Sequence, residues 1–72
     1  MSTPFPDQVA GNVRAALARS QVTQRTLAER TGRSQAYWSR RLNGETDLDV
    51  GDLEAVAGLV GVSTASLLAV PA

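Results

Sequence analysis

The sequence of 72 residues contains no cysteine and no histidine. Their absence excludes disulfide bridges, thiolate zinc sites, cysteine or histidine nucleophiles and histidine general bases. We therefore expect no catalytic residue, no metal and no cofactor. The chain has about half of the ~150 residues typical of a domain, which predicts one small domain. A hydrophobic fraction of 43% and a charged fraction of 19% predict that this domain folds.

Long apolar stretches are also missing. No run of about 18 apolar residues could span a membrane, and the first residues lack the basic flank and apolar stretch of a signal peptide. We therefore expect a cytoplasmic protein that makes no membrane contact.

Lysine is absent as well, and a net charge of zero conceals a strong asymmetry along the chain. Seven arginines and two acids give residues 1–44 a charge of +5, whereas five acids and no base give residues 45–72 a charge of −5. A basic half suits a polyphosphate partner, although charges segregated on solvated helix faces would give the same pattern. The five acids are Glu45, Asp47, Asp49, Asp52 and Glu54.

The periodicity of apolar residues predicts an all-α protein with five helices and no strand. Pro4 and Pro6 place residues 1–6 in a loose arm before the domain, which extends over residues 7–69 and is followed by a short tail, residues 70–72. Residues that can cap helix N-termini and glycines that can end helices set the helix limits. The expected N-caps are Thr23, Ser34, Asp49 and Ser63, and the expected terminal glycines are Gly32 and Gly61. The expected helices cover residues 7–20, 24–31, 35–43, 50–60 and a short segment after Ser63 that contains Leu67 and Leu68.

Residues 23–44 follow the order TQxxLAxxxGxSQxxxSRxxNG. Two short helices joined by a tight glycine turn are what a helix-turn-helix requires. The order resembles the Cro/C1-type family, also described as XRE-like or phage-repressor-like, and the likeness covers nearly the whole chain. The resemblance implies a compact five-helix lambda-repressor-like domain. It also implies that Gln24 holds a DNA phosphate and braces Gln35.

Several positions in this segment have a structural explanation. Ala28 is small where the two helices cross, Gly32 permits a positive φ at the corner, and Trp38 is expected in the core. Thr31 and Arg33 flank Gly32 at positions where the family usually has apolar residues, which predicts a turn that is more hydrated than usual. Arg41 departs in the same way, and we hypothesise that its stem is buried and that it pairs with an acid of residues 45–54.

The face of the second helix opposite Trp38 and Leu42 is predicted to read bases in the major groove. A glutamine carboxamide fits adenine, an arginine fork fits guanine or phosphate, and an alanine methyl fits the thymine methyl. The predicted base-reading residues are Gln35, Ala36, Ser39 and Arg40.

Contacts to the DNA backbone are predicted at helix N-termini and in the loop after residue 42, where amides and polar side chains favour phosphate. For Tyr37 two interpretations stay open, an edge of the core and a backbone contact. Arg14, Arg19 and Arg30 are expected to be solvated side chains. The predicted backbone-binding residues are Gln24, Arg25, Arg33, Ser34, Tyr37 and Asn43.

These features predict a sequence-specific regulator of transcription, a small Cro-like repressor of double-stranded DNA that is controlled by its own concentration. We expect no small-molecule ligand. Homodimerisation on a symmetric operator would use Val62, Leu67, Leu68 and Val70, unless these residues close the core of a monomer. The alternative is a helix-turn-helix used as a protein-interaction module, antitoxin-like or anti-regulator, whose acidic half meets a basic partner. An enzyme is the weakest interpretation.

Overall fold

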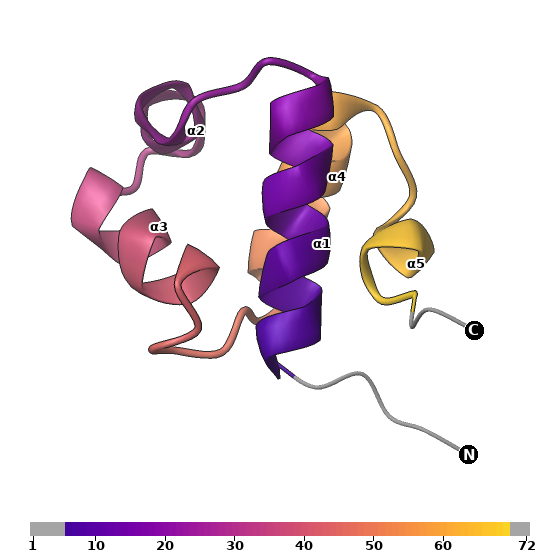
Figure 1. The fold of residues 1–72 in the computed structure, drawn as a ribbon. Coiled ribbons are helices and arrows are strands. Elements are labelled where there is room, and N and C mark those ends of the chain that lie inside the picture. The colour runs from indigo at the N-terminus through magenta and orange to yellow at the C-terminus, as the bar shows by residue number, and fades with distance from the viewer. Residues whose placement is uncertain (1–5, 70–72) are drawn as a thin grey trace.

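The computed structural model describes residues 6–69, which form five helices and no strand. The first helix runs through the middle of the domain. The second and third lie on one side of it, the fourth lies against it and the fifth lies on the other side (Figure 1). This arrangement confirms the prediction of an all-α five-helix domain. The helices are α1 Pro6–Arg19, α2 Gln24–Thr31, α3 Gln35–Leu42, α4 Val50–Val60 and α5 Thr64–Leu67.

Side-chain caps fix the N-termini of four helices. Thr23, Ser34, Asp49 and Ser63 each have extended backbone, and the side chain of each accepts a hydrogen bond from a backbone N–H in the first turn. These caps were predicted from residue type alone, and all of them are confirmed.

The helix limits differ from the prediction at a few residues. Helix α1 begins at Pro6, so placing Pro6 in a preceding arm was wrong. Proline is well suited to the first position of a helix, because its missing N–H has no helical partner there. Asn43 caps α3 instead of belonging to it. The remainder of the predicted arm, residues 1–5, and the tail, residues 70–72, lie outside the described residues.

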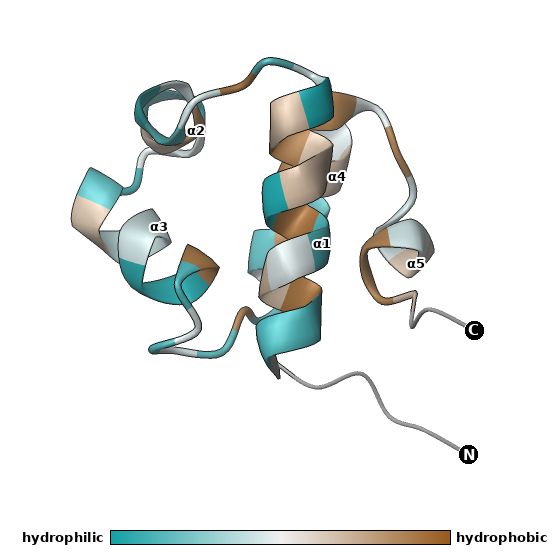
Figure 2. Cartoon of the chain, in the orientation of Figure 1, coloured by the Kyte–Doolittle hydropathy of each residue, from teal (hydrophilic) through white to brown (hydrophobic). Residues whose placement is uncertain are grey.

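One apolar stripe of α1 organises the core. Polar and apolar residues alternate around this helix as the chain turns (Figure 2), and its apolar side faces the other helices. Trp38 of α3 is 1% exposed and is the largest side chain of the core, as predicted. No helix within residues 6–69 has the length and hydropathy needed to cross a bilayer. The core residues contributed by α1 are Val9, Val13, Ala16 and Leu17.

Candidate nucleic-acid interface

Helix α3 has one face in the core and one face in solvent. Trp38 and Leu42, four residues apart, are both buried. The side chains on the other face are exposed, apart from Ser39, which is half-buried. The structure thus places all four predicted base-reading residues on one accessible side of the helix, followed by Asn43 at its end. These residues are Gln35, Ala36, Ser39, Arg40 and Asn43.

The turn between α2 and α3 sets the angle at which this face is presented. Gly32 has φ 72° and ψ 20°, the left-handed conformation that glycine adopts at low cost, and its N–H bonds to the carbonyl oxygen of Ala28. Ala28 itself is buried, as its small size predicted. The predicted corner is therefore confirmed in its conformation and in its packing.

The N-termini of α2 and α3 carry the two glutamines singled out by the motif. Gln24 and Gln35 are the first residues of these helices, and both are exposed. Among residues 6–69 no hydrogen bond joins them, so the bracing contact implied by the family resemblance is absent in the free chain. At the start of α3 the Ser34 Oγ accepts from the Tyr37 N–H at 3.0 Å, which leaves the Ser34 hydroxyl hydrogen available as a donor.

Arg25, predicted to contact the DNA backbone, is exposed on α2. Its Nε lies 3.5 Å from Glu29 Oε2, one helical turn away. The side chains of the pair are 76% and 66% exposed, so their interaction is weak and the guanidinium can exchange Glu29 for another anion.

Residue Arg41 and Asp52 form the ion pair that links α3 to α4. Arg41 Nε donates to Asp52 Oδ2 at 2.8 Å, with side chains 18% and 3% exposed. The hypothesis that Arg41 pairs with an acid of residues 45–54 is confirmed. The acid lies in the first turn of α4, where Asp52 also accepts from the Asp49 N–H at 3.1 Å and completes a capping box.

Tyr37 completes the same cluster. Its hydroxyl donates to Asp52 Oδ1 at 2.5 Å, and its ring lies under the guanidinium of Arg41, 3.7 Å from the ring centroid. The hydrogen bond to Asp52, followed by desolvation, raises the pKa of the Tyr37 phenol above its usual 10.0. Because the hydroxyl hydrogen is used inside the protein, the structure favours the core-edge interpretation of Tyr37.

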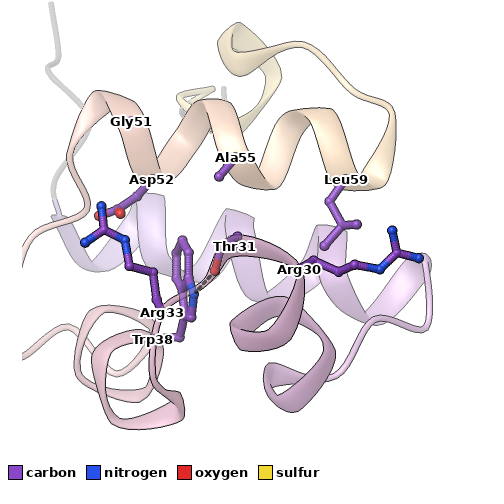
Figure 3. Close-up of a pocket in the computed structure, with 8 residues that line it drawn as sticks. All are labelled: Arg30, Thr31, Arg33, Trp38, Gly51, Asp52, Ala55 and Leu59. Carbon is purple, nitrogen blue, oxygen red and sulfur yellow. Dashed lines mark hydrogen bonds between the residues drawn. The ribbon is translucent and has the colours of Figure 1, made fainter.

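Arg33 differs from the other residues predicted to bind the DNA backbone. Its guanidinium lies over the Tyr37 ring, 4.7 Å from the ring centroid. The side chain extends toward α4 and lies near Asp52 (Figure 3). The structure therefore does not bring Arg33 to the exposed face of α3.

Thr31, in the turn that was predicted to be more hydrated than usual, makes hydrogen bonds within the protein. Trp38 Nε1 donates to Thr31 Oγ1 at 2.9 Å, and the Thr31 hydroxyl donates to the Leu27 carbonyl oxygen at 2.7 Å. A buried indole N–H needs such an acceptor, which an apolar residue at position 31 could not supply.

Sequence reasoning missed the role of Arg14. Its Nη1 donates to the Leu42 carbonyl oxygen, so α1 holds the C-terminal end of α3, where cations are favoured. Arg14 also lines a depression of about 230 Å³ together with Gln24. Its position next to Val13 and three residues before Leu17, beside the apolar stripe, was the available signal.

The chain after α3 folds back on the helix. The Glu45 N–H and the Thr46 N–H both bond to the Arg40 carbonyl oxygen, at 2.8 and 3.3 Å. The Asn43 amide is exposed and makes a long contact of 3.4 Å with Ser39 Oγ. Asn43 therefore sits in a defined turn with its amide close to the predicted base-reading face.

The predicted dimer surface is divided by the structure. Leu67 is 2% exposed and belongs to the core, so for this residue the second interpretation, closure of the core, is confirmed. Val62 and Leu68 are 37% and 40% exposed. Val70 lies outside the described residues.

Comparisons with known proteins agree with this geometry. The clp gene regulator ClgR from Corynebacterium glutamicum superimposes with a TM-score of 0.80 at 28% identity, over 88% of this chain and 82% of that one. A hypothetical transcription factor, NHTF, from Neisseria gives a TM-score of 0.81 at 23% identity, over 99% and 86%. The restriction-modification controller protein C.AhdI from Aeromonas hydrophila gives a TM-score of 0.76 at 16% identity, over 85% of this chain and 92% of that one.

No curated protein matches the chain in sequence. A family model of the helix-turn-helix domain, by contrast, matches residues 8–70, which is most of the chain. The chain belongs to the helix-turn-helix domain family.

Proposed function

We propose that this chain binds a specific double-stranded DNA sequence and regulates transcription, with α3 inserted in the major groove. The observation that carries the proposal is that Gln35 and Arg40 of α3 are exposed while Trp38 and Leu42 of the same helix are buried, and that this exposed side begins at the N-terminus of α3. A helix of this kind fits the width of the major groove, and helix N-termini favour phosphate. The similarity to ClgR, a gene regulator, supports the same conclusion.

Base reading is assigned to side chains in the first and last turns of α3. Gln35 is exposed at the first position and can bond adenine through both atoms of its carboxamide. Arg40 is exposed one turn further on, where its fork can reach guanine or a phosphate. Ala36 offers a methyl to thymine, and Ser39 offers a hydroxyl to either kind of base edge.

Anchoring to the DNA backbone is assigned to groups around this face. Gln24 and Ser34 stand at the two helix N-termini, Arg25 is exposed on α2, and Asn43 is exposed in the turn after α3. We assign no DNA contact to Arg33 or Tyr37, because Arg33 stacks on the Tyr37 ring and the Tyr37 hydroxyl donates to Asp52.

The regulatory mode that fits a small domain of this kind is repression by occupancy of a promoter, as in a Cro-like switch. A symmetric operator would be bound by two copies, and the exposed Val62 and Leu68 are the side chains we assign to their contact. This function would place the protein with the chromosomal DNA in the cytoplasm of a bacterial or phage-infected cell.

Selection from a pool of randomised duplexes tests the proposal. The chain is incubated with the pool at two salt concentrations, and the bound fraction is sequenced. Enrichment of one motif is expected, as a palindrome if two copies bind and as a single half-site if one copy binds. Binding without enrichment that disappears at moderate salt would favour the protein-interaction alternative instead.

Three variants assign the contacts within the selected motif. Gln35→Ala should weaken the free energy of binding to the selected motif by about 1–3 kcal/mol and relax discrimination at one base position. Arg25→Ala should weaken binding to all sequences alike. It should also lower by about 1 the slope with which the logarithm of the binding constant falls with the logarithm of the salt concentration. Arg19→Gln, at the end of α1, is the matched control and should change neither the affinity for DNA nor its salt dependence. An equal loss on specific and random DNA for Gln35→Ala, or a loss confined to the selected motif for Arg25→Ala, would contradict the assigned roles.

A further inference from the structure

A groove of about 400 Å³ lies between α4 and the helix-turn-helix (Figure 3). One wall is a stripe of α4 formed by Gly51, Ala55 and Leu59, which are spaced four residues apart and so share a face. Trp38 and Thr31 lie opposite this stripe. The volume is at the lower end of the range of ligand sites in proteins.

The two ends of the groove are basic. Arg33 lies at the end near Gly51, and Arg30 lies at the end near Leu59 (Figure 3). Neither guanidinium has a carboxylate partner among residues 6–69, since Arg33 only stacks on Tyr37. The one acid that lines the groove, Asp52, is buried and already holds Arg41 and the Tyr37 hydroxyl. The exposed charged side chains that line the groove are therefore both arginines.

We infer that this groove binds an extended acidic peptide segment of a partner protein, with an apolar residue between two acidic ones. Gly51 and Leu59 are eight residues apart on α4, which corresponds to about 12 Å along the helix. An extended chain covers that length in about four residues. Two carboxylates four positions apart would then meet Arg33 and Arg30, and the apolar side chain between them would lie on Ala55 and Leu59.

The groove and the proposed DNA face lie on different sides of α3. Trp38 lines the groove, whereas the proposed base-reading residues Gln35, Ser39 and Arg40 do not line it. A partner in the groove would leave the base-reading side chains uncovered. The inference goes beyond DNA binding and does not depend on it.

The intact chain is titrated with the peptide acetyl-Glu-Ala-Leu-Ala-Glu-amide, and binding is followed by the fluorescence and the indole N–H resonance of Trp38, the single tryptophan. The same peptide with glutamine in place of both glutamates is the neutral control, and acetyl-Glu-Leu-Glu-amide is the spacing control. We expect saturable binding of the first peptide and weaker binding of both controls. Arg30→Gln and Arg33→Gln should each weaken it by about threefold to fivefold, the effect of one exposed ion pair.

The matched variant Arg19→Gln removes an exposed arginine that does not line the groove and should bind the peptide like the unmodified chain. Absence of binding would overturn the inference, and so would an equal loss in Arg19→Gln, which would indicate only general charge attraction.

Adipate, a dicarboxylate without a peptide backbone, is titrated in parallel. If it bound as tightly as the peptide, the groove would be a small-molecule site and the peptide inference would be wrong. Failure of DNA selection with intact peptide binding would separate this result from the proposed function.

Discussion

Replacing Arg41 by methionine tests whether the ion pair with Asp52 holds α3 against α4. Removing one partner of a buried ion pair costs about 3–5 kcal/mol, because the remaining charge stays buried without compensation. Arg41 retains some solvent exposure, and Asp52 would keep its hydrogen bonds from Tyr37 and Asp49. We therefore expect Arg41→Met to lower the free energy of unfolding by about 2–3 kcal/mol.

This loss is large for so small a domain. A chain of 72 residues is expected to have an unfolding free energy of about 4–11 kcal/mol. The expected loss corresponds to a fall in Tm of about 10–20 °C. Urea denaturation followed by Trp38 fluorescence measures it directly, because Trp38 is the only tryptophan and is buried in the folded chain.

A second substitution separates the charge effect from lost packing. Asp52→Asn removes the buried charge but keeps a carbonyl oxygen for the Asp49 N–H. Introduced into Arg41→Met, it should restore part of the stability, since the uncompensated carboxylate is gone. Unchanged or increased stability of Arg41→Met would refute the reasoning, as would an Asp52→Asn effect that is equally destabilising with and without Arg41.

Three further predictions concern neighbouring groups. Tyr37 is the only tyrosine, so its absorbance titration should have a midpoint above pH 10, and Asp52→Asn should lower that midpoint. Because the folded-state pKa is raised, the stabilisation from this hydroxyl is present below about pH 10 and is lost as pH rises through the raised pKa, which urea titrations at several pH values would show. Gly32→Ala should cost about 1–2 kcal/mol in urea denaturation, because position 32 has a positive φ. Thr31→Val should cost about 1–3 kcal/mol by the same method and shift the indole N–H resonance of Trp38, whose acceptor it removes.

The local signals in the sequence predicted most of the fold. Cap residues and helix-ending glycines act within one turn of the chain, so Ser34 and Gly32 could be assigned without any knowledge of distant contacts. The inward position of Trp38 followed from helical spacing in the same way. The exposed face of α3 could therefore be listed from the sequence.

Contacts between distant segments were harder to predict, because residue type does not state which partner a side chain reaches. Arg14 was expected in solvent, although it bonds to a carbonyl group 28 positions along the chain. Leu67 fits a dimer surface and a core equally well by composition, and only the packing of α5 on α1 decides between them. The role of Tyr37 also depended on knowing that Asp52 lies across from it.

The packing of α5 on α1 has a consequence for synthesis on the ribosome. The Asn12 Nδ2 donates to the carbonyl oxygens of Leu67 and Ala69, at 2.9 and 2.8 Å, and Leu67 shares the core with Val9 and Val13. These partners are translated 55 or more residues after Asn12, which takes about 3–11 s at ordinary elongation rates. Until then the apolar stripe of α1 lacks the part of its cover that α5 supplies, and this apolar surface of the nascent chain can bind chaperones or aggregate.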